Sequence, residues 1–203
     1  AVGMHALKQT TSGGYNTAVG RRALEENTTG QYNTAIGGLA LDANTTADGN
    51  TAVGYNAMSA NTTGTQNVAF GTNALDASTT GSDITAIGYE ALTNSTTGGS
   101  NTALGHRALM KNTTGASNAA GGREALRENT TGQQNTAFGA FALDALTTGT
   151  NCTAVGYNAL TDATGIHNTA IGESAGSNIT TGTNNTCLGK FARPSAVNAT
   201  DQI

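Results

Sequence analysis

The residue types that most often do chemistry are scarce in this chain of 203 residues and do not cluster. The chain holds three histidines, two cysteines, nine lysines plus arginines and 13 aspartates plus glutamates. His5, His106 and His167 are far apart, and no cysteine–histidine group has zinc-site spacing. No recurring acidic pair favours general acid–base chemistry, and no Ser–His–Asp arrangement or phosphate loop stands out. We therefore expect no catalytic residue, metal site or cofactor, and we expect that the chain is not an enzyme.

Two other sets of residues are candidates for surface interactions. Tyrosine, arginine and histidine side chains that come after a recurring glycine are predicted to be exposed and to contact host-surface glycans: Arg21, Arg22, Tyr55, Tyr89, His106, Arg107 and Tyr157. Asn-x-Ser/Thr sequons mark glycosylation candidates, the first six being Asn27, Asn44, Asn61, Asn94, Asn112 and Asn129. Several of these asparagines also recur at one place in a repeat, which favours a structural use.

A repeat of 17 residues defines the structural elements on which these side chains lie. Its consensus is N-T-A-φ-G-x-x-A-L-x-x-N-T-T-G-x-x, where φ is aliphatic or Phe, and its positions are numbered 1 to 17. The unit from Cys152 is one residue short. Residues 1–189 form the repeat region with an incomplete first unit, and residues 190–203 are expected to be a cap or the start of another segment. Units begin at Asn16, Asn33, Asn50, Asn67, Ile84, Asn101, Asn118, Asn135, Cys152, Asn168 and Asn185.

The columns of this repeat predict an interior and a surface. Position 5 is always glycine, which indicates a positive φ or close backbone approach. The aliphatic residues of position 4 and the leucines of position 9 are predicted to fill the interior, with Gly121 as a weak point in the first of these columns. Alanine at position 3 then faces outward, either against another copy or at a tight corner. Positions 6–11 fit a helical turn or an irregular arc.

The polar columns predict ladders along the stack. Asparagines at positions 1 and 12 are expected to hydrogen-bond from unit to unit. In the Thr-Thr pair of positions 13 and 14, one column is expected to face water. Regular threonine arrays also suggest an ice-binding function, and an ice-binding face normally presents two threonine columns side by side. Cys152 and Cys187 lie two units apart, about 9–10 Å, too far for a disulfide, and are expected to be small buried residues.

A unit this short cannot bury its own core, so each must stack on its neighbours. The prediction is an all-β fold: a β-solenoid of 17-residue coils. At about 4.8 Å per coil, eleven to twelve coils make a rod of roughly 50–60 Å. The net charge of −4 offers no basic face for nucleic acid. No apolar run reaches the roughly 20 residues of a membrane span, and no leader is present. Since the chain starts inside a repeat, we expect a longer parent protein.

The motif NTAVGYNAL…NTTG resembles the head repeats of trimeric autotransporter adhesins, which are parallel β-rolls with shorter units. It is still more similar to the repeat region of bacterial and phage tail-fibre-domain-containing proteins, and the final segment 195–203 is similar to the segment located after the repeats of those proteins. The resemblance implies a homotrimeric parallel β-roll, located outside the cell, on its surface or on a virion appendage. The expected function is a rigid structural or adhesive shaft. The alternatives are a glycan-binding fibre and a filament subunit that stacks end to end.

Overall fold

Each repeat forms one short strand at positions 2–4. In the computed structural model, which describes residues 1–202, the position 5 glycine ends every strand. Each strand is three residues long because glycine breaks the extended backbone immediately after it. The strands are β1 Thr17–Val19, β2 Thr34–Ile36, β3 Thr51–Val53, β4 Val68–Phe70, β5 Thr85–Ile87, β6 Thr102–Leu104, β7 Ala119–Gly121, β8 Thr136–Phe138, β9 Thr153–Val155, β10 Thr169–Ile171 and β11 Thr186–Leu188.

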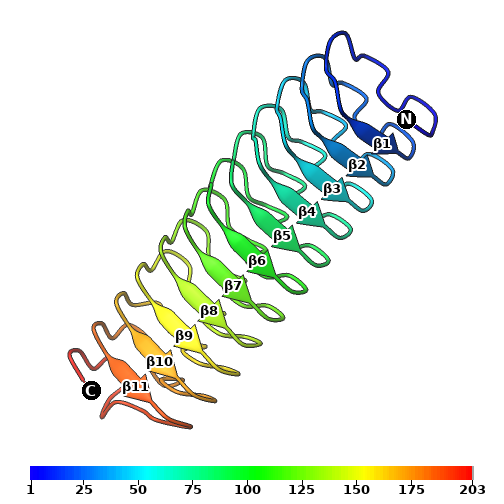
Figure 1. Cartoon of the computed structure of the whole chain (residues 1–203). Helices are drawn as coiled ribbons and strands as arrows, with labels where there is room; N and C mark the ends of the chain where they lie inside the picture. The colour runs from blue at the N-terminus through cyan, green and yellow to red at the C-terminus, as the bar shows by residue number, and fades with distance from the viewer. Residues whose placement is uncertain (203) are drawn as a thin grey trace.

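These strands form a single parallel sheet of eleven strands, in sequence order. Equivalent positions pair, as in Ala18 with Ala35 and Ala35 with Ala52. The short unit keeps this register, since Thr153 pairs with Thr169 and the deleted residue falls in the loop. Figure 1 shows the coils stacked along one axis with the termini at opposite ends. The predicted β-solenoid of 17-residue coils is therefore confirmed.

The interior of the coil is narrow and is filled by small side chains and one leucine. The alanines of positions 3 and 8 and the leucine or methionine of position 9 are fully buried, as in Ala52, Ala57 and Met58. The prediction that the leucine column is interior is confirmed. Leu75, Leu92, Leu109, Leu126 and Leu143 continue it.

The prediction for positions 3 and 4 is wrong, because the two columns are exchanged. Ala18 and Ala35 are completely buried, whereas Val19 and Ile36 are each 40% exposed. The reason is lack of space. Leucine from the opposite wall already fills the apolar half of the coil, so only a methyl group fits beneath the strand. Alternation along the strand then turns the branched side chain outward. The alanine columns line the coil interior and cannot be a contact face between copies.

The other half of the interior consists of asparagine side chains. At position 1, Asn33 Nδ2 donates to the carbonyl of Ala47 in its own coil at 2.8 Å, and its backbone N–H donates to Asn16 Oδ1 at 2.8 Å. At position 12, Asn44 Nδ2 donates to Asn27 Oδ1 of the preceding coil at 2.8 Å. The predicted asparagine ladders are confirmed. They close most coils and join them to their neighbours, whereas the coils that begin at Ile84 and Cys152 have no asparagine at position 1 or position 12.

Positions 6–11 form an irregular arc, which decides between the two predicted alternatives. The non-glycine residues of positions 7 and 9 adopt left-handed backbone conformations, as at Asn73 (φ 55°) and Leu75 (φ 54°). Hydrogen bonds to the next coil hold the arc, for example from Leu75 N–H to the Ala91 carbonyl at 2.9 Å. Such conformations cost energy for side-chain-bearing residues and persist where the surroundings impose them.

Residues 190–202 complete the coil that carries β11 and reach the first position after it. Gly176 N–H donates to the Ala192 carbonyl at 2.8 Å, and Thr186 N–H donates to the Gln202 carbonyl at 2.7 Å, as equivalent groups do in earlier coils. In this coil Arg193 replaces the position 9 leucine. A hollow of about 330 Å³ lies beside it, lined in part by Cys187, Leu188 and Ala192.

Both cysteines are free and buried, as predicted. Cys152 is fully buried and Cys187 is 5% exposed, and burial raises the pKa of each thiol. Residues 1–202 contain no helix that could span a membrane.

Candidate interaction surfaces

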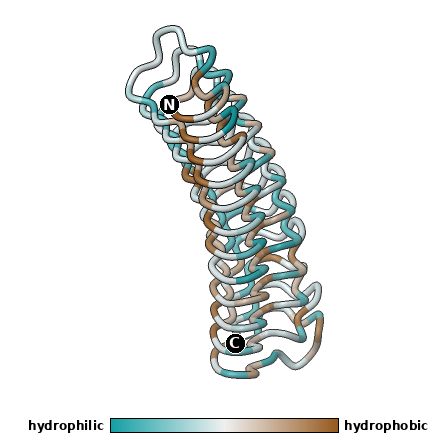
Figure 2. The backbone as a smooth tube through the Cα atoms, turned by 90° about the vertical axis from the view of Figure 1, so that its right-hand side faces the viewer, coloured by the Kyte–Doolittle hydropathy of each residue, from teal (hydrophilic) through white to brown (hydrophobic). Residues whose placement is uncertain are grey.

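The outward side chains of positions 2 and 4 form a continuous surface over the strands, named here the apolar sheet face. Position 4 contributes the exposed branched and aromatic residues, such as Ile36, Phe70 (55% exposed) and Ile87. Position 2 contributes threonine in most coils. From β1 to β11 neither position carries a charged residue. Figure 2 shows hydrophobic segments recurring along one side of the rod. Contiguous exposed apolar surface of this extent is typical of an interaction site.

Gly121 lies on the apolar sheet face, so it is not the predicted break in the interior. The ring of Phe138 from the next coil covers it. A Cβ added to Gly121 would meet ring carbons Cδ1 and Cε1 of Phe138 at 2.5 Å. One phenyl ring thus keeps the face apolar across β7 and β8.

The seven residues predicted to contact glycans are spread along one edge of the rod, just after the position 5 glycines, from the coil of Arg21 to that of Tyr157. This edge is named here the corner edge. Arg21, Tyr55, Tyr89, His106 and Tyr157 occupy position 6 and are exposed. Arg22 and Arg107 occupy position 7 and are half-buried. Because equivalent positions stack, residues of different coils share this edge, as the repeat predicts. His5 occupies position 7 and His106 position 6, six coils apart, so they form no common site.

Aromatic and charged groups of the corner edge contact one another between coils. The rings of Tyr89 and His106 stack with centroids 5.4 Å apart. Arg107 Cζ lies 5.9 Å from the centre of the Tyr89 ring, and Arg107 Nε donates to Glu90 Oε2 at 2.7 Å. This hydrogen bond is the largest cause of the lowered pKa of Glu90. Around Tyr89 the edge therefore combines exposed rings with a paired arginine and glutamate.

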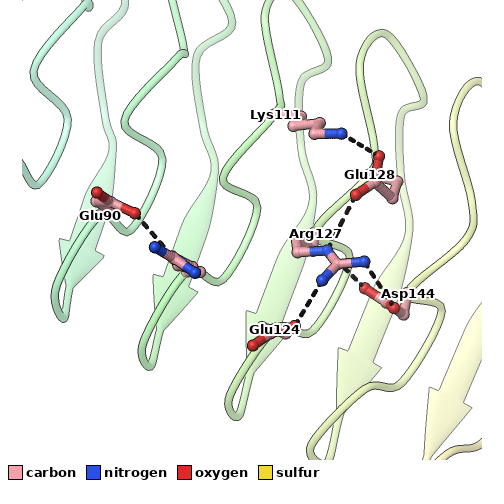
Figure 3. Close-up of polar contacts among 7 residues, drawn as sticks. Glu90, Lys111, Glu124, Arg127, Glu128 and Asp144 are labelled. Carbon is pink, nitrogen blue, oxygen red and sulfur yellow. Dashed lines mark hydrogen bonds and ion pairs between the residues drawn. The ribbon is translucent and has the colours of Figure 1, made fainter.

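Ion pairs between coils continue beside the corner edge, at positions 7, 10 and 11. Arg127 contacts Glu124 Oε2 at 2.7 Å, Glu128 Oε1 at 3.0 Å and Asp144 Oδ1 at 3.3 Å, while Lys111 contacts Glu128 Oε2 at 2.5 Å (Figure 3). The hydrogen bond from Lys111 lowers the pKa of Glu128 most, whereas burial raises the pKa of Asp144. Within residues 1–202, no three of the His, Cys, Asp and Glu side chains are placed to hold a metal ion. This network joins neighbouring coils.

The two threonine columns differ less in exposure than predicted. The position 13 hydroxyls point along the rod, as where Thr28 Oγ1 donates to the Thr45 carbonyl at 3.0 Å. The position 14 residues, such as Thr29 and Thr46, are exposed. The position 13 threonines are only half-buried in most coils, and Thr147, Thr164 and Thr180 are exposed. Position 14 is the more exposed column, but position 13 also reaches water.

Most of the sequon asparagines predicted as glycosylation candidates lie inside the coil. Asn27, Asn44, Asn61, Asn112 and Asn129 are fully buried. The side-chain amide of each donates a hydrogen bond, either to the asparagine of the preceding coil or to a glycine carbonyl of its own coil. A glycan on any of them is incompatible with the folded coil. Asn94 alone of the six is exposed, because it occupies position 11 instead of position 12.

Burial therefore predicts which sequons carry glycans. In a glycosylating secretory host, folded protein should carry glycans on exposed Asn94, Asn151 and Asn184 and none on Asn44 or Asn61. Peptide mass mapping of the secreted protein measures this, with enzymatic deglycosylation in labelled water marking each occupied site. A glycopeptide containing modified Asn44 in protein with the native circular dichroism spectrum would contradict the buried ladder.

The apolar sheet face was missed by reasoning from the sequence. A signal was present: position 4 accepts Val, Ile, Leu, Phe and Gly, and a tightly packed interior column tolerates less variation in volume than this. Position 3, with almost invariant alanine, shows the restriction expected of the interior. Comparisons with protein-family models, curated proteins and solved structures found no match to this chain.

Proposed function

We propose that this chain is a non-catalytic structural segment, a rigid shaft of an extracellular fibre on a cell surface or virion appendage. The observation that carries the proposal is the uncharged apolar sheet face on a continuously hydrogen-bonded rod. The location is inferred from the resemblance of the repeat motif to fibre and adhesin repeats. In such a shaft the rod holds other parts of the protein at a distance from the surface.

The case for a stiff shaft is the number of independent links between coils. The strands pair without interruption from β1 to β11. The arc and the threonine segment add backbone hydrogen bonds, such as Leu92 N–H to the Ala108 carbonyl at 3.0 Å and Thr62 N–H to the Thr79 carbonyl at 3.0 Å. Asparagine ladders and ion pairs add further links. Bending the rod would lengthen hydrogen bonds and ion pairs of several of these kinds at once.

The case for association of shafts is the composition of the apolar sheet face. Burying exposed Val, Ile and Phe side chains yields about 25 cal/mol per Å² removed from water. A second copy of the chain has the same spacing from coil to coil, so a contact made by Ile36 can recur at Ile87 and throughout the face. We propose that copies associate through this face, in a trimer as the resemblance implies. This assembly replaces the one predicted through the alanine columns.

Charges introduced on the apolar sheet face should separate the copies without unfolding them. Native mass spectrometry and sedimentation of the unchanged chain should give three times the mass of one chain. The double variant Ile36→Lys, Ile87→Lys should give a single mass and an unchanged circular dichroism spectrum, because both side chains are about 40% exposed. Lysine ammonium groups buried between copies would be unpaired and costly.

A matched control places the same charges elsewhere. Thr46→Lys, Thr97→Lys changes two exposed residues of position 14, on another side of the coil, and should keep the threefold mass. A twofold mass that the sheet-face lysines abolish would replace the trimer with a dimer through the same face. A mass that increases with protein concentration and is unchanged by those lysines would favour end-to-end filaments. A single mass for the unchanged chain would overturn self-association.

A further inference from the structure

Two exposed tyrosines of the corner edge flank a residue without a ring. Tyr55 and Tyr89 both occupy position 6, and Thr72 occupies the same position in the coil between them. Tyr55 is 55% exposed and Tyr89 is 44% exposed. At about 4.8 Å per coil, equivalent atoms of the two tyrosines are roughly 10 Å apart along the rod.

Rings at equivalent positions of adjacent coils face one another along the rod. Tyr89 stacks on His106 at 5.4 Å with 17° between the ring planes, and Tyr15 stacks on Tyr32 at 5.2 Å with 2° between the planes. Tyr55 lies against the preceding coil, with Cδ2 3.6 Å from where a Cβ on Gly38 would be. Thr72 carries no ring, so the coil between Tyr55 and Tyr89 leaves the two tyrosines without a ring between them at this edge.

The adjoining position 7 residues of these coils are polar. Asn56 and Asn73 carry amides, and Glu90 carries a carboxylate; all three are half-buried. The Glu90 carboxylate accepts a hydrogen bond from Arg107 at 2.7 Å, so the charge near Tyr89 is balanced. A ligand here would meet two aromatic rings, two amides and little net charge.

We propose that Tyr55, Thr72 and Tyr89, with Asn56 and Asn73, form a contact site for one neutral pyranose ring of a glycan. A pyranose has apolar C–H faces and a rim of hydroxyl groups. Aromatic rings pack against other rings at centroid separations of about 4.5–7 Å, so two such contacts need at least about 9 Å, which the two-coil spacing provides. The asparagine amides can donate to and accept from the hydroxyl rim.

The same features disfavour other ligands. A single-stranded nucleic acid needs a positive groove along its backbone, whereas this chain has a net charge of −4. An extended peptide advances about 3.3 Å per residue, whereas the coils are about 4.8 Å apart. Its side chains would therefore not recur at the spacing of the coils. The sugar site goes beyond the proposed structural role and does not depend on the association of copies.

Ligand-observed NMR can test this site with simple sugars. The probes are the methyl pyranosides of glucose, galactose, mannose and N-acetylglucosamine, measured by saturation transfer from the whole chain. We expect transfer to the ring C–H protons of at least one probe. Tyr55→Ala or Tyr89→Ala should weaken binding by about fivefold or more. Thr72→Tyr should abolish it, since a third ring would occupy the place, and position 6 already accepts tyrosine.

A control separates this site from nonspecific binding. Tyr157→Ala removes an exposed tyrosine outside the site and should leave the transfer unchanged. All variants should keep the native circular dichroism spectrum. The proposal is overturned if no pyranoside receives saturation, if Thr72→Tyr leaves transfer intact, or if indole binds in place of all four sugars.

Discussion

Replacing Leu75 with aspartate should lower the free energy of unfolding by at least about 3 kcal/mol. Leu75 is fully buried in the apolar half of the coil. Its backbone is also held by the next coil, with N–H bound to the Ala91 carbonyl at 2.9 Å. An aspartate would lose the packing of the leucine and place an unpaired carboxylate among alanine methyl groups. Thermal unfolding followed by circular dichroism measures the loss.

The matched control for this variant is Asn73→Asp. Asn73 has the same left-handed backbone, with φ 55° against 54° for Leu75, but it is half-buried, and its column holds Glu90 and Glu124 in later coils. It should unfold within about 0.5 kcal/mol of the unchanged chain. Because solenoids can open locally, hydrogen exchange should also show loss of protection centred on the Leu75 coil. Equal melting of both variants would mean that Leu75 is not interior.

Gly37→Ala should be the other strongly destabilising change, by about 3 kcal/mol or more. Gly37 has a φ of 134°, a region that side-chain-bearing residues scarcely populate. A Cβ there would also collide with the carbonyl of Gly54 in the next coil. The sheet cannot absorb that collision without separating two coils. Chemical denaturation monitored by circular dichroism should show a lower midpoint.

The adjacent residue provides the control. Gly38 has no positive φ, and the nearest atom to a Cβ placed on it is Tyr55 Cδ2 at 3.6 Å, an ordinary contact. Gly38→Ala should therefore be neutral or slightly stabilising, since alanine restricts the unfolded chain more than glycine does. If Gly37→Ala were as mild as Gly38→Ala, the close stacking of the corners would be wrong.

The constant repeat length predicted the architecture, because units of equal length can stack in register and such a stack is a solenoid. Equal units place like residues in columns, and the observed pairing of Thr34 with Thr51 results from that alone. The invariant glycine of position 5 indicated a backbone corner. The asparagine columns indicated ladders, because amides placed one strand spacing apart can bond to each other.

Substitutions within the core compensate one another in ways that the columns alone do not reveal. Gly176 replaces the position 9 leucine, and its coil carries Ile179 where most coils have asparagine. A Cβ on Gly176 would lie 3.3 Å from Ile179 Cδ1 and 2.8 Å from Leu160 Cδ2. Isoleucine thus fills the space that the missing leucine leaves. These two positions compensate each other only because the fold brings them together.

The sequence by itself determined the period, the strand positions, the stacking register, the glycine corners and the columns to which every candidate surface residue belongs. The tertiary structure decided which columns face inward. Alternation along a strand makes positions 3 and 4 opposite but does not say which is inside. That choice depends on the width of the closed coil, where leucine and asparagine from the far wall leave room for alanine alone. The branched residues are consequently outside, and the sequon asparagines are inside.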